Sequence, residues 1–283
     1  MIDFLTRLDK RWIFLAMLLA VSIPILIQKS FPEETTQIVQ DVFDEIEGLP
    51  EGSRVLISFD YDPASGGELD PMSTALVRHL CEKKHKIYFM ALWPLGPRVA
   101  EDTIARVIKT EFPQMVYGKD YVNLGYKSGG EGVIQVIVDN LRKLYPSDLQ
   151  GTSLSAMDMT RDLRNIRQMD LILSISAGTG GAKEWIQYAA TPYKIRTAVG
   201  CTGVQAPLFY PYYPNQMLGL LPAIKGAAEY EAAVAKKYPR FASPDKNEGL
   251  RRMSPQLVAH LLMVVLIILG NVVYFAQRRK GAA

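Results

Sequence analysis

The sequence contains few of the residues on which metal sites, disulfide frameworks and nucleophilic catalysis depend. Among its 283 residues are two cysteines and three histidines. Neither Cys81 nor Cys201 belongs to a CxxC pair or stands near a His-rich cluster, so the spacing predicts no zinc site and no disulfide framework. The two thiols can pair only if the fold brings them together, and we expect two buried free thiols. We expect no metal and no cofactor.

The histidines are also poorly placed for activating a nucleophile. Cys201 follows an apolar stretch, where a nucleophile commonly lies. His79 falls in a predicted helix, His85 precedes a predicted strand, and His260 lies within a long apolar run. None of them is positioned to remove a proton from Cys201, so the pattern does not favour a cysteine hydrolase.

The chain has little excess charge and no internal repeat of fixed period. Its formal net charge is +3, which is too small to indicate binding of nucleic acid. Its hydrophobic content is 48%, which is ample for a folded core.

Two long uncharged apolar runs stand near the ends of the chain, at residues 12–27 and 257–276. A helix needs about 20 residues to cross roughly 30 Å of hydrocarbon. A cleaved signal peptide is the alternative for the first run, but no small-x-small site follows it. A buried core helix is the alternative for the second, but its apolar residues cover every face. We therefore predict transmembrane helices at 12–28 and 257–276 and a lipid bilayer as a partner.

Basic residues near these runs predict the orientation. Arg7, Lys10 and Arg11 precede the first run, and Arg278, Arg279 and Lys280 follow the second. By the positive-inside rule, residues 1–11 and the basic tail 277–283 are cytoplasmic. The sequence thus predicts a two-pass protein of the cell membrane whose middle part, residues 31–254, is extracytoplasmic.

Strand and helix patterns alternate within residues 31–254. Apolar strand candidates lie at 55–61, 86–93, 170–176 and 195–201, and helix candidates at 35–47, 70–84, 97–112, 130–145, 180–190 and 217–238. This rhythm predicts an α/β fold: a doubly wound, Rossmann- or flavodoxin-like, mostly parallel sheet. The stretch 114–126 is either a short strand or a loop, and 239–254 is expected to be a polar linker.

Asp60 and Asp62 are the candidate catalytic residues, since they follow the first predicted strand and ligands bind beyond the carboxyl ends of parallel strands. The Asp-x-Asp pattern resembles the first motif of the haloacid dehalogenase superfamily. The resemblance implies that Asp60 is a phosphoryl nucleophile and Asp62 a general acid or base. It also implies that Ser174 or Ser176 is the phosphate-binding hydroxyl and Lys183 the lysine. The sequence departs from the family at Ala64 and in lacking a later acidic motif for magnesium.

A purely structural interpretation of the same stretch is also open. Asp62-Pro63 favours a turn. Asp70 followed by Pro71 is the pattern of a helix start, with Asp at the N-cap and Pro at the first helical position.

A glycine-rich turn, 177–183, follows the third predicted strand. Its candidate ligand-binding residues are Gly178, Gly180, Gly181 and Lys183, because backbone N–H groups at such a turn can hold a carboxylate or phosphate. The spacing matches neither a P-loop nor the GxGxxG fingerprint. Tight packing between strand and helix is the alternative.

A loop rich in tyrosine and proline supplies the candidate interface residues Tyr210, Tyr212 and Tyr213, since tyrosine is enriched at protein interfaces. We therefore predict a membrane-attached subunit whose α/β domain is a structural or assembly module. It would act as a homo-oligomer or with other membrane-complex subunits. The alternatives are a small-ligand binding or sensing domain, and a metal-assisted hydrolase that uses Asp60 and Asp62.

Overall fold

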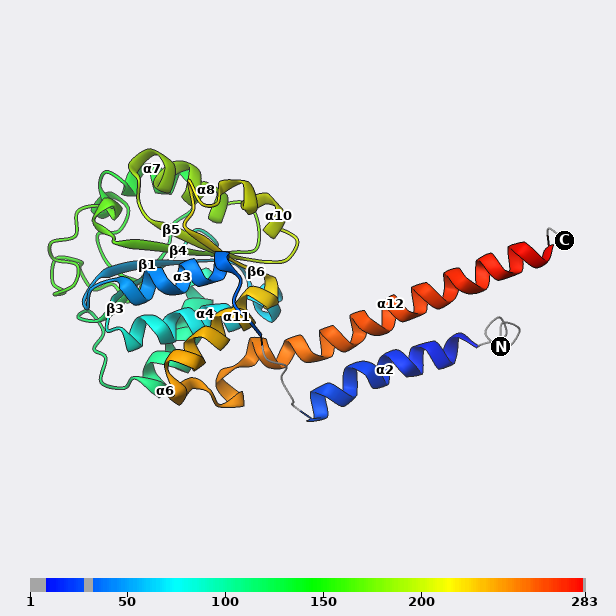
Figure 1. Ribbon diagram of the computed structural model, residues 1–283. Helices are drawn as coiled ribbons and strands as arrows, with labels where there is room; N and C mark the ends of the chain where they lie inside the picture. The colour runs from blue at the N-terminus through cyan, green and yellow to red at the C-terminus, as the bar shows by residue number, and fades with distance from the viewer. Residues whose placement is uncertain (1–8, 28–32, 282–283) are drawn as a thin grey trace. The chain divides into compact units, whose positions relative to one another are not determined.

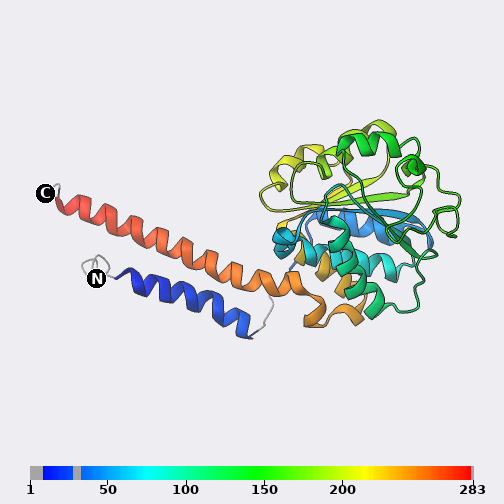
Figure 2. The same cartoon turned by 180° about the vertical axis from the view of Figure 1, so that it is seen from behind.

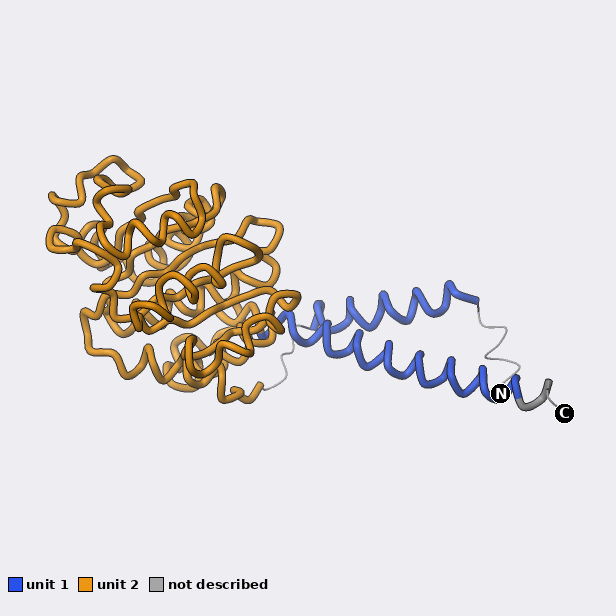
Figure 3. Tube along the Cα trace, turned by 90° about the horizontal axis from the view of Figure 1, so that it is seen from above, with its two compact units in different colours: residues 1–32, 250–283 blue, residues 33–249 orange. Residues whose placement is uncertain are grey.

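A computed structural model describes residues 9–27 and 33–281 of the chain. The chain divides into two compact units (Figure 3). One unit is Glu33–Gly249, which we call the α/β domain. The other consists of the two terminal segments, described separately below.

The α/β domain is built on one six-stranded sheet in which every neighbouring pair of strands is parallel. The order across the sheet is β3-β2-β1-β4-β5-β6, which is typical of doubly wound α/β sheets. The chain order reverses between β1 and β4. The strands are β1 (Arg54–Asp60), β2 (Lys86–Ala91), β3 (Tyr121–Tyr126), β4 (Leu171–Ser176), β5 (Thr197–Cys201) and β6 (Gly219–Pro222).

Helices cover both faces of the sheet, as Figures 1 and 2 show from opposite sides. The strands are buried almost throughout, because a parallel sheet with helices on both faces excludes water from both. One face carries α3 (Gln37–Gly48), α4 (Gly66–Glu82), α5 (Gly96–Thr103), α6 (Lys109–Glu111) and α11 (Ala223–Lys237). The other carries α7 (Glu131–Ile137), α8 (Ala182–Trp185), α9 (Thr191–Tyr193) and α10 (Ala206–Phe209).

The four strands predicted from the sequence are present, and two more complete the sheet. The stretch 114–126, which the sequence left open, contains β3. The other addition, β6, lies inside the region predicted as the helix 217–238. Its four residues pair with β5 through the backbone, and Ala223, the first residue of α11, has a φ of +54° at the change from strand to helix. Four apolar residues carry too little periodicity to distinguish a strand from a helix.

Several predicted helices have different bounds. The helix expected to start at Asp70 begins four residues earlier, at Gly66, so Pro71 lies inside α4. The region 97–112 contains α5 and α6 joined by a π-helical turn, Ile104–Ile108. The region 130–145 contains only α7 and a 3-10 turn, Leu141–Lys143.

The predicted polar linker 239–254 is folded instead. Two 3-10 turns, Pro239–Phe241 and Pro244–Lys246, precede α12 (Glu248–Gly281). Phe241 is buried. The side-chain amide of Asn247 donates to the carbonyl oxygens of Phe241 at 2.8 Å and Ser243 at 2.9 Å. One aromatic residue and one asparagine therefore fix a segment whose composition is polar.

Both ends of the α/β domain are bound to α11. Near the first end, the backbone N–H and the hydroxyl of Thr36 donate to the carboxylate of Glu229, at 2.8 and 2.6 Å. At the other end, the N–H of Gly249 donates to Glu231 at 3.0 Å. Both glutamates are buried, and buried carboxylates are stable only when they accept such hydrogen bonds. One helix thus holds both places where the chain leaves the domain.

The terminal segments each contain a helix that is long and apolar enough to cross a membrane. These helices are α2 (Lys10–Ile27) and α12. In the most apolar stretch of each, no side chain is buried by the protein. Residue 28, the predicted end of the first span, and residues 1–8 lie outside the described residues.

The two cysteines are free and buried, as expected. Cys81 lies on α4, and Cys201 ends β5. Burial raises the pKa of the Cys201 thiol to about 12 and raises that of Cys81 as well. Both therefore remain protonated, unreactive thiols at neutral pH.

Substitution of Gly219 tests how closely α3 packs against β6. A Cβ at this position would lie 2.5 Å from Cγ2 of Val42 and 2.6 Å from the carbonyl oxygen of Ile38. We expect Gly219→Ala to lower the free energy of unfolding by about 1–3 kcal/mol, the usual cost of overpacking, as measured by denaturant titration of the full chain in detergent.

Gly48→Ala is the matched control, because a Cβ there meets no heavy atom within 4 Å. It should change the free energy of unfolding by less than about 0.5 kcal/mol. Equal effects of the two substitutions would contradict the close crossing.

Candidate functional site

The carboxyl ends of β1 and β4 bring Asp60 close to the glycine-rich turn, at the point where the strand order reverses. Asp60 ends β1, and Ser176 ends β4 beside it in register. The glycine-rich turn 177–181 follows β4, and the loop after β2 contributes Leu92 and Trp93. In sheets of this kind, ligands bind at such a reversal point, so the polar groups there need to be accounted for individually.

The carboxylate of Asp60 is fully buried and accepts four hydrogen bonds. Oδ1 accepts from the hydroxyl of Ser58 and from the backbone N–H of Leu92, both at 2.7 Å. Oδ2 accepts from the indole N–H of Trp185 at 3.0 Å and from the hydroxyl of Ser174 at 3.3 Å. These donors come from β1, the end of β2, β4 and α8. Each oxygen thus has two partners from the protein itself.

Burial raises the pKa of Asp60 from 3.8 to about 7. Desolvation disfavours the charged form, and the four hydrogen bonds limit the rise because they favour it. A nucleophile or metal ligand needs an accessible oxygen lone pair, whereas both oxygens of Asp60 are enclosed. We infer that Asp60 is a structural acceptor that joins neighbouring strands.

Asp62 and Asp60 serve different local structures. The carboxylate of Asp62 accepts hydrogen bonds from the N–H groups of Ala64, at 3.0 Å, and Ser65, at 3.3 Å. It therefore caps the 3-10 turn Pro63–Ser65, a usual role for aspartate. Between them, Tyr61 is buried, and its hydroxyl lies 3.0 Å from Asp70 and 2.8 Å from Ser73. The two carboxylates of the Asp-x-Asp pattern thus have separate sets of hydrogen-bond partners.

The glycines of the turn after β4 are required by packing. A Cβ on Gly181 would lie 2.2 Å from the hydroxyl oxygen of Ser176 and 3.1 Å from Cβ of Asp60. A Cβ on Gly178 would lie 2.9 Å from the ring of Trp93. Gly180 has a φ of +75°, which only glycine adopts readily. The indole N–H of Trp93 donates to the carbonyl of Thr179 at 3.0 Å, so the loop after β2 is joined to this turn.

The position at which an anion would meet this turn is taken by a side chain of the protein. The N–H of Gly181 donates to the carboxylate of Glu184 at 2.7 Å. Lys183 is exposed on the outer side of α8. Ser174 donates to Asp60, and Ser176 donates to the carbonyl of Gly178 at 3.2 Å. The residues that the dehalogenase-like pattern assigns to phosphate binding therefore do not converge on one open site.

The predicted interface tyrosines differ in exposure. Tyr212 is partly buried and accepts a hydrogen bond from Gln187 at 3.2 Å. Tyr213 is also partly buried and donates to Asp41. Tyr210 is exposed. Two of the three tyrosines therefore hold the loop to the domain, and only Tyr210 is free to contact another molecule.

Two exposed apolar residues that sequence reasoning missed stand close to Tyr210 in the chain. Val204 is 88% exposed and Leu208 is 64% exposed. We give the name α10 patch to these three exposed residues, which belong to α10 or to the residues next to it in the chain. Their neighbours in the chain include Pro207 and Pro211, both exposed.

Other residues of the site carried a signal in the sequence. Ser58 and Asp60 are two apart on one strand and therefore point to the same face. Glu184 stands three residues after Gly181, which is the spacing of a capping box. Trp185 gave no such signal, because only the fold brings α8 above the end of β1.

Within residues 9–27 and 33–281, no three His, Cys, Asp or Glu side chains are grouped so that they could hold a metal ion. No protein-family model matches the chain, and no curated protein matches it.

Replacing Asp60 tests its structural role. In Asp60→Asn, either orientation of the amide places its NH₂ group against a group that can only donate, Leu92 N–H or Trp185 N–H. We expect the free energy of unfolding at pH 7 to fall by about 1–3 kcal/mol, the cost of leaving buried donors unpaired, as measured by denaturant titration of the full chain in detergent. Asp62→Asn is the matched control, because asparagine caps turns as well as aspartate does, and it should leave stability nearly unchanged. A larger loss in Asp62→Asn would reverse the assignment.

The raised pKa of Asp60 also predicts a pH dependence. Between pH 3.8 and about 7 the folded chain holds a proton on Asp60 that the unfolded chain has lost. The contribution of Asp60 to the free energy of unfolding is therefore fully present below pH 3.8 and is lost as the pH rises through 7. The cost of Asp60→Asn should shrink between pH 5 and pH 8, by at most about 1.4 kcal/mol per pH unit.

The difference between wild type and variant is the quantity to measure, because His79 acts with the opposite sign. Burial lowers the pKa of His79 to about 4. Its contribution is present above pH 6.5 and is lost as the pH falls toward 4. A cost of Asp60→Asn that stays constant between pH 5 and pH 8 would show that Asp60 is ionised in the folded protein throughout this range, which would contradict the raised pKa.

Proposed function

We propose that this chain is a two-pass membrane protein whose α/β domain associates with a second copy of itself through the α10 patch, as an assembly module. The observation that carries the proposal is the contrast between the carboxyl end of β1 and the carboxyl end of β5. The polar groups at the end of β1 are hydrogen-bonded within the domain, whereas the segment after β5 exposes apolar side chains to water.

The closed state of the reversal point argues against catalysis there. Both oxygens of Asp60 are enclosed by four donors, and the glycine turn is covered by Trp93 and capped by Glu184. A site that activates water or a phosphate needs open ligand positions and accessible donors. The proposal therefore favours the assembly role over the hydrolase and over a ligand site at this point.

The composition around the α10 patch supports a protein partner. Residues 197–224 contain no charged side chain. Depletion of charge with enrichment of tyrosine is typical of the buried centre of protein interfaces. A segment that binds an anionic membrane surface usually carries lysine or arginine on its polar face, and this segment has none. A second copy of the same neutral surface is a suitable occupant.

The membrane part of the proposal rests on α2 and α12. Apolar residues on all sides of a long helix require a hydrocarbon environment or a partner. Basic residues outside the spans, among them Lys10, Arg11 and Arg278, favour cytoplasmic ends. The α/β domain is then extracytoplasmic. Its attachment at both ends would limit its rotation and favour repeated contact with neighbouring copies.

Native mass spectrometry of the full chain in mild detergent tests the proposal. We expect a discrete oligomer for the wild type. Val204→Asp and Leu208→Asp should each shift it toward the monomer, because an interface must desolvate the new carboxylate.

Leu95→Asp is the matched control. Leu95 is 49% exposed and lies at the same edge of the sheet, in the loop that follows β2. It is the N-cap of α5, where aspartate is well tolerated. Leu95→Asp should leave the oligomer intact. A monomeric wild type, or dispersal by all three substitutions alike, would contradict the proposal.

A further inference from the structure

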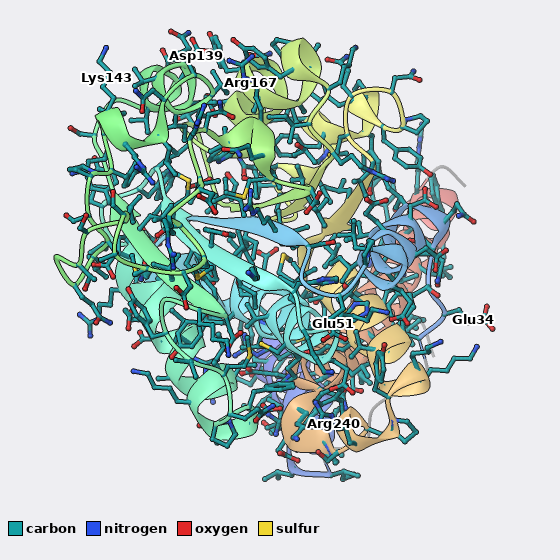
Figure 4. The ribbon with its side chains drawn as sticks, turned by 90° about the vertical axis from the view of Figure 1, so that its left-hand side faces the viewer. Glu34, Glu51, Asp139, Lys143, Arg167 and Arg240 are labelled. Atoms are coloured by element: carbon teal, nitrogen blue, oxygen red, sulfur yellow. The ribbon has the colours of Figure 1, made fainter. Side chains whose placement is uncertain are left out.

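A cavity of about 420 Å³ is lined only by residues of the α/β domain, and none of them belongs to the candidate site described above. Arg78 of α4, Arg106 and Glu111 of the segment after β2, and the turns between α11 and α12 line it. The turns contribute Arg240, Asp245 and Lys246. Figure 4 shows Arg240 beside the last turns of the domain, across the sheet from Asp139 and Arg167. We call this the basic cavity.

Arg78 is the most deeply placed charge of the basic cavity. Its side chain is 7% exposed. Its Nε donates to both oxygens of Glu111, at 2.9 and 3.2 Å, and its Nη1 donates to the carbonyl of Lys246 at 2.8 Å. Because its Nε and Nη1 are both hydrogen-bonded, the guanidinium is held in one orientation before any ligand arrives, which lowers the entropic cost of binding.

The other cations are also held in place. Arg240 stacks on the rings of Phe112 and Phe241, at 4.8 and 4.5 Å, and pairs with Glu82. Lys246 lies 3.4 Å from Glu111 and 5.3 Å from the ring centre of Phe241. Glu111 is therefore shared by Arg78 and Lys246. The lining holds four cations and two carboxylates, Glu111 and Asp245. Because Glu82 also pairs with Arg240, one positive charge is in excess.

We propose that the basic cavity binds a phosphate group. The excess positive charge favours an anionic ligand, and a phosphate monoester carries a charge of about −1.5 to −2 at pH 7. Guanidinium groups recognise its oxygens in a fixed fork geometry, and an ammonium adds a point charge. The volume lies in the range of small-ligand sites, about 300–1,000 Å³, so the phosphate is accommodated with part of the molecule that bears it.

The phosphate has two chemical sources, an anionic lipid headgroup and a soluble phosphate compound. The position of the cavity favours the lipid, because Arg240 and Lys246 belong to the last turns before α12. This preference rests on the membrane location proposed above. The binding of phosphate itself does not, since it depends only on the α/β domain.

Lipid binding to the full chain in nonionic detergent separates these sources. Native mass spectrometry would follow added dioleoyl phosphatidic acid, with dioleoyl phosphatidylcholine as the zwitterionic control. Phosphorus-31 line broadening would follow inorganic phosphate. We expect phosphatidic acid to bind more tightly than either. Arg106→Gln and Lys246→Gln should each weaken its binding at least tenfold.

Arg98→Gln is the matched control, because Arg98 is exposed on α5 and does not line the cavity. It should bind phosphatidic acid as the wild type does. Equal thermal unfolding midpoints of the three variants would show that the cavity variants remain folded. A variant that does not remain folded is replaced by Arg106→Lys, which keeps the charge but loses the fork and should bind with intermediate affinity.

Each outcome is informative. Preference for phosphatidic acid, lost in the cavity variants, supports a lipid headgroup. Binding of inorganic phosphate that is equally tight, and lost in the same variants, supports a soluble phosphate compound. Binding that is absent, or that is the same in cavity variants and control, overturns the proposal. A monomeric particle that still binds phosphate would refute the assembly role alone.

Discussion

The hydrogen bonds of Asp60 are the constraint on which the carboxyl edge of the sheet depends. One side chain joins β1 to the end of β2, to β4 and to α8. Burying a carboxyl group is costly unless every lone pair is satisfied, so the donors must be present together. Gly181 has to be glycine because the turn passes directly over this carboxylate. An apparent catalytic motif is thus explained by the assembly of the sheet.

The regular part of the fold was predictable because its strands are continuous apolar runs separated by amphipathic helices. The sequence could not show β6, whose four residues become a strand only by pairing with β5. Nor could it show that Phe241 and Asn247 fold the expected linker onto the domain. The position of the candidate site was predictable from the end of β1. Whether a ligand could reach Asp60 was not predictable. Whether Asp60 faces a ligand or a tryptophan depends on α8, more than a hundred residues away in the chain.

The structure separates three regions with different polar character. The reversal point is polar, closed and internally satisfied. The α10 patch is neutral and apolar, and it lies after β5. The basic cavity is charged and lies between α4, the segment after β2 and the last turns of the domain. Only the first region contains short sequence patterns that resemble known sites. The basic cavity is composed of residues distant in sequence, and neither it nor the α10 patch contains a motif.

The attachment of both chain exits to α11 has a mechanical consequence. Thr36 and Gly249 are bound to Glu229 and Glu231, two residues apart on that helix. A force that pulls on either terminal segment would enter the domain through the same two carboxylates. The tension would load α11 and its contacts with α4, while the strands of the sheet would lie outside the load path. Stretching the chain by its ends should therefore detach α11 before it separates β1 from β4, and the core would survive as an intact remnant.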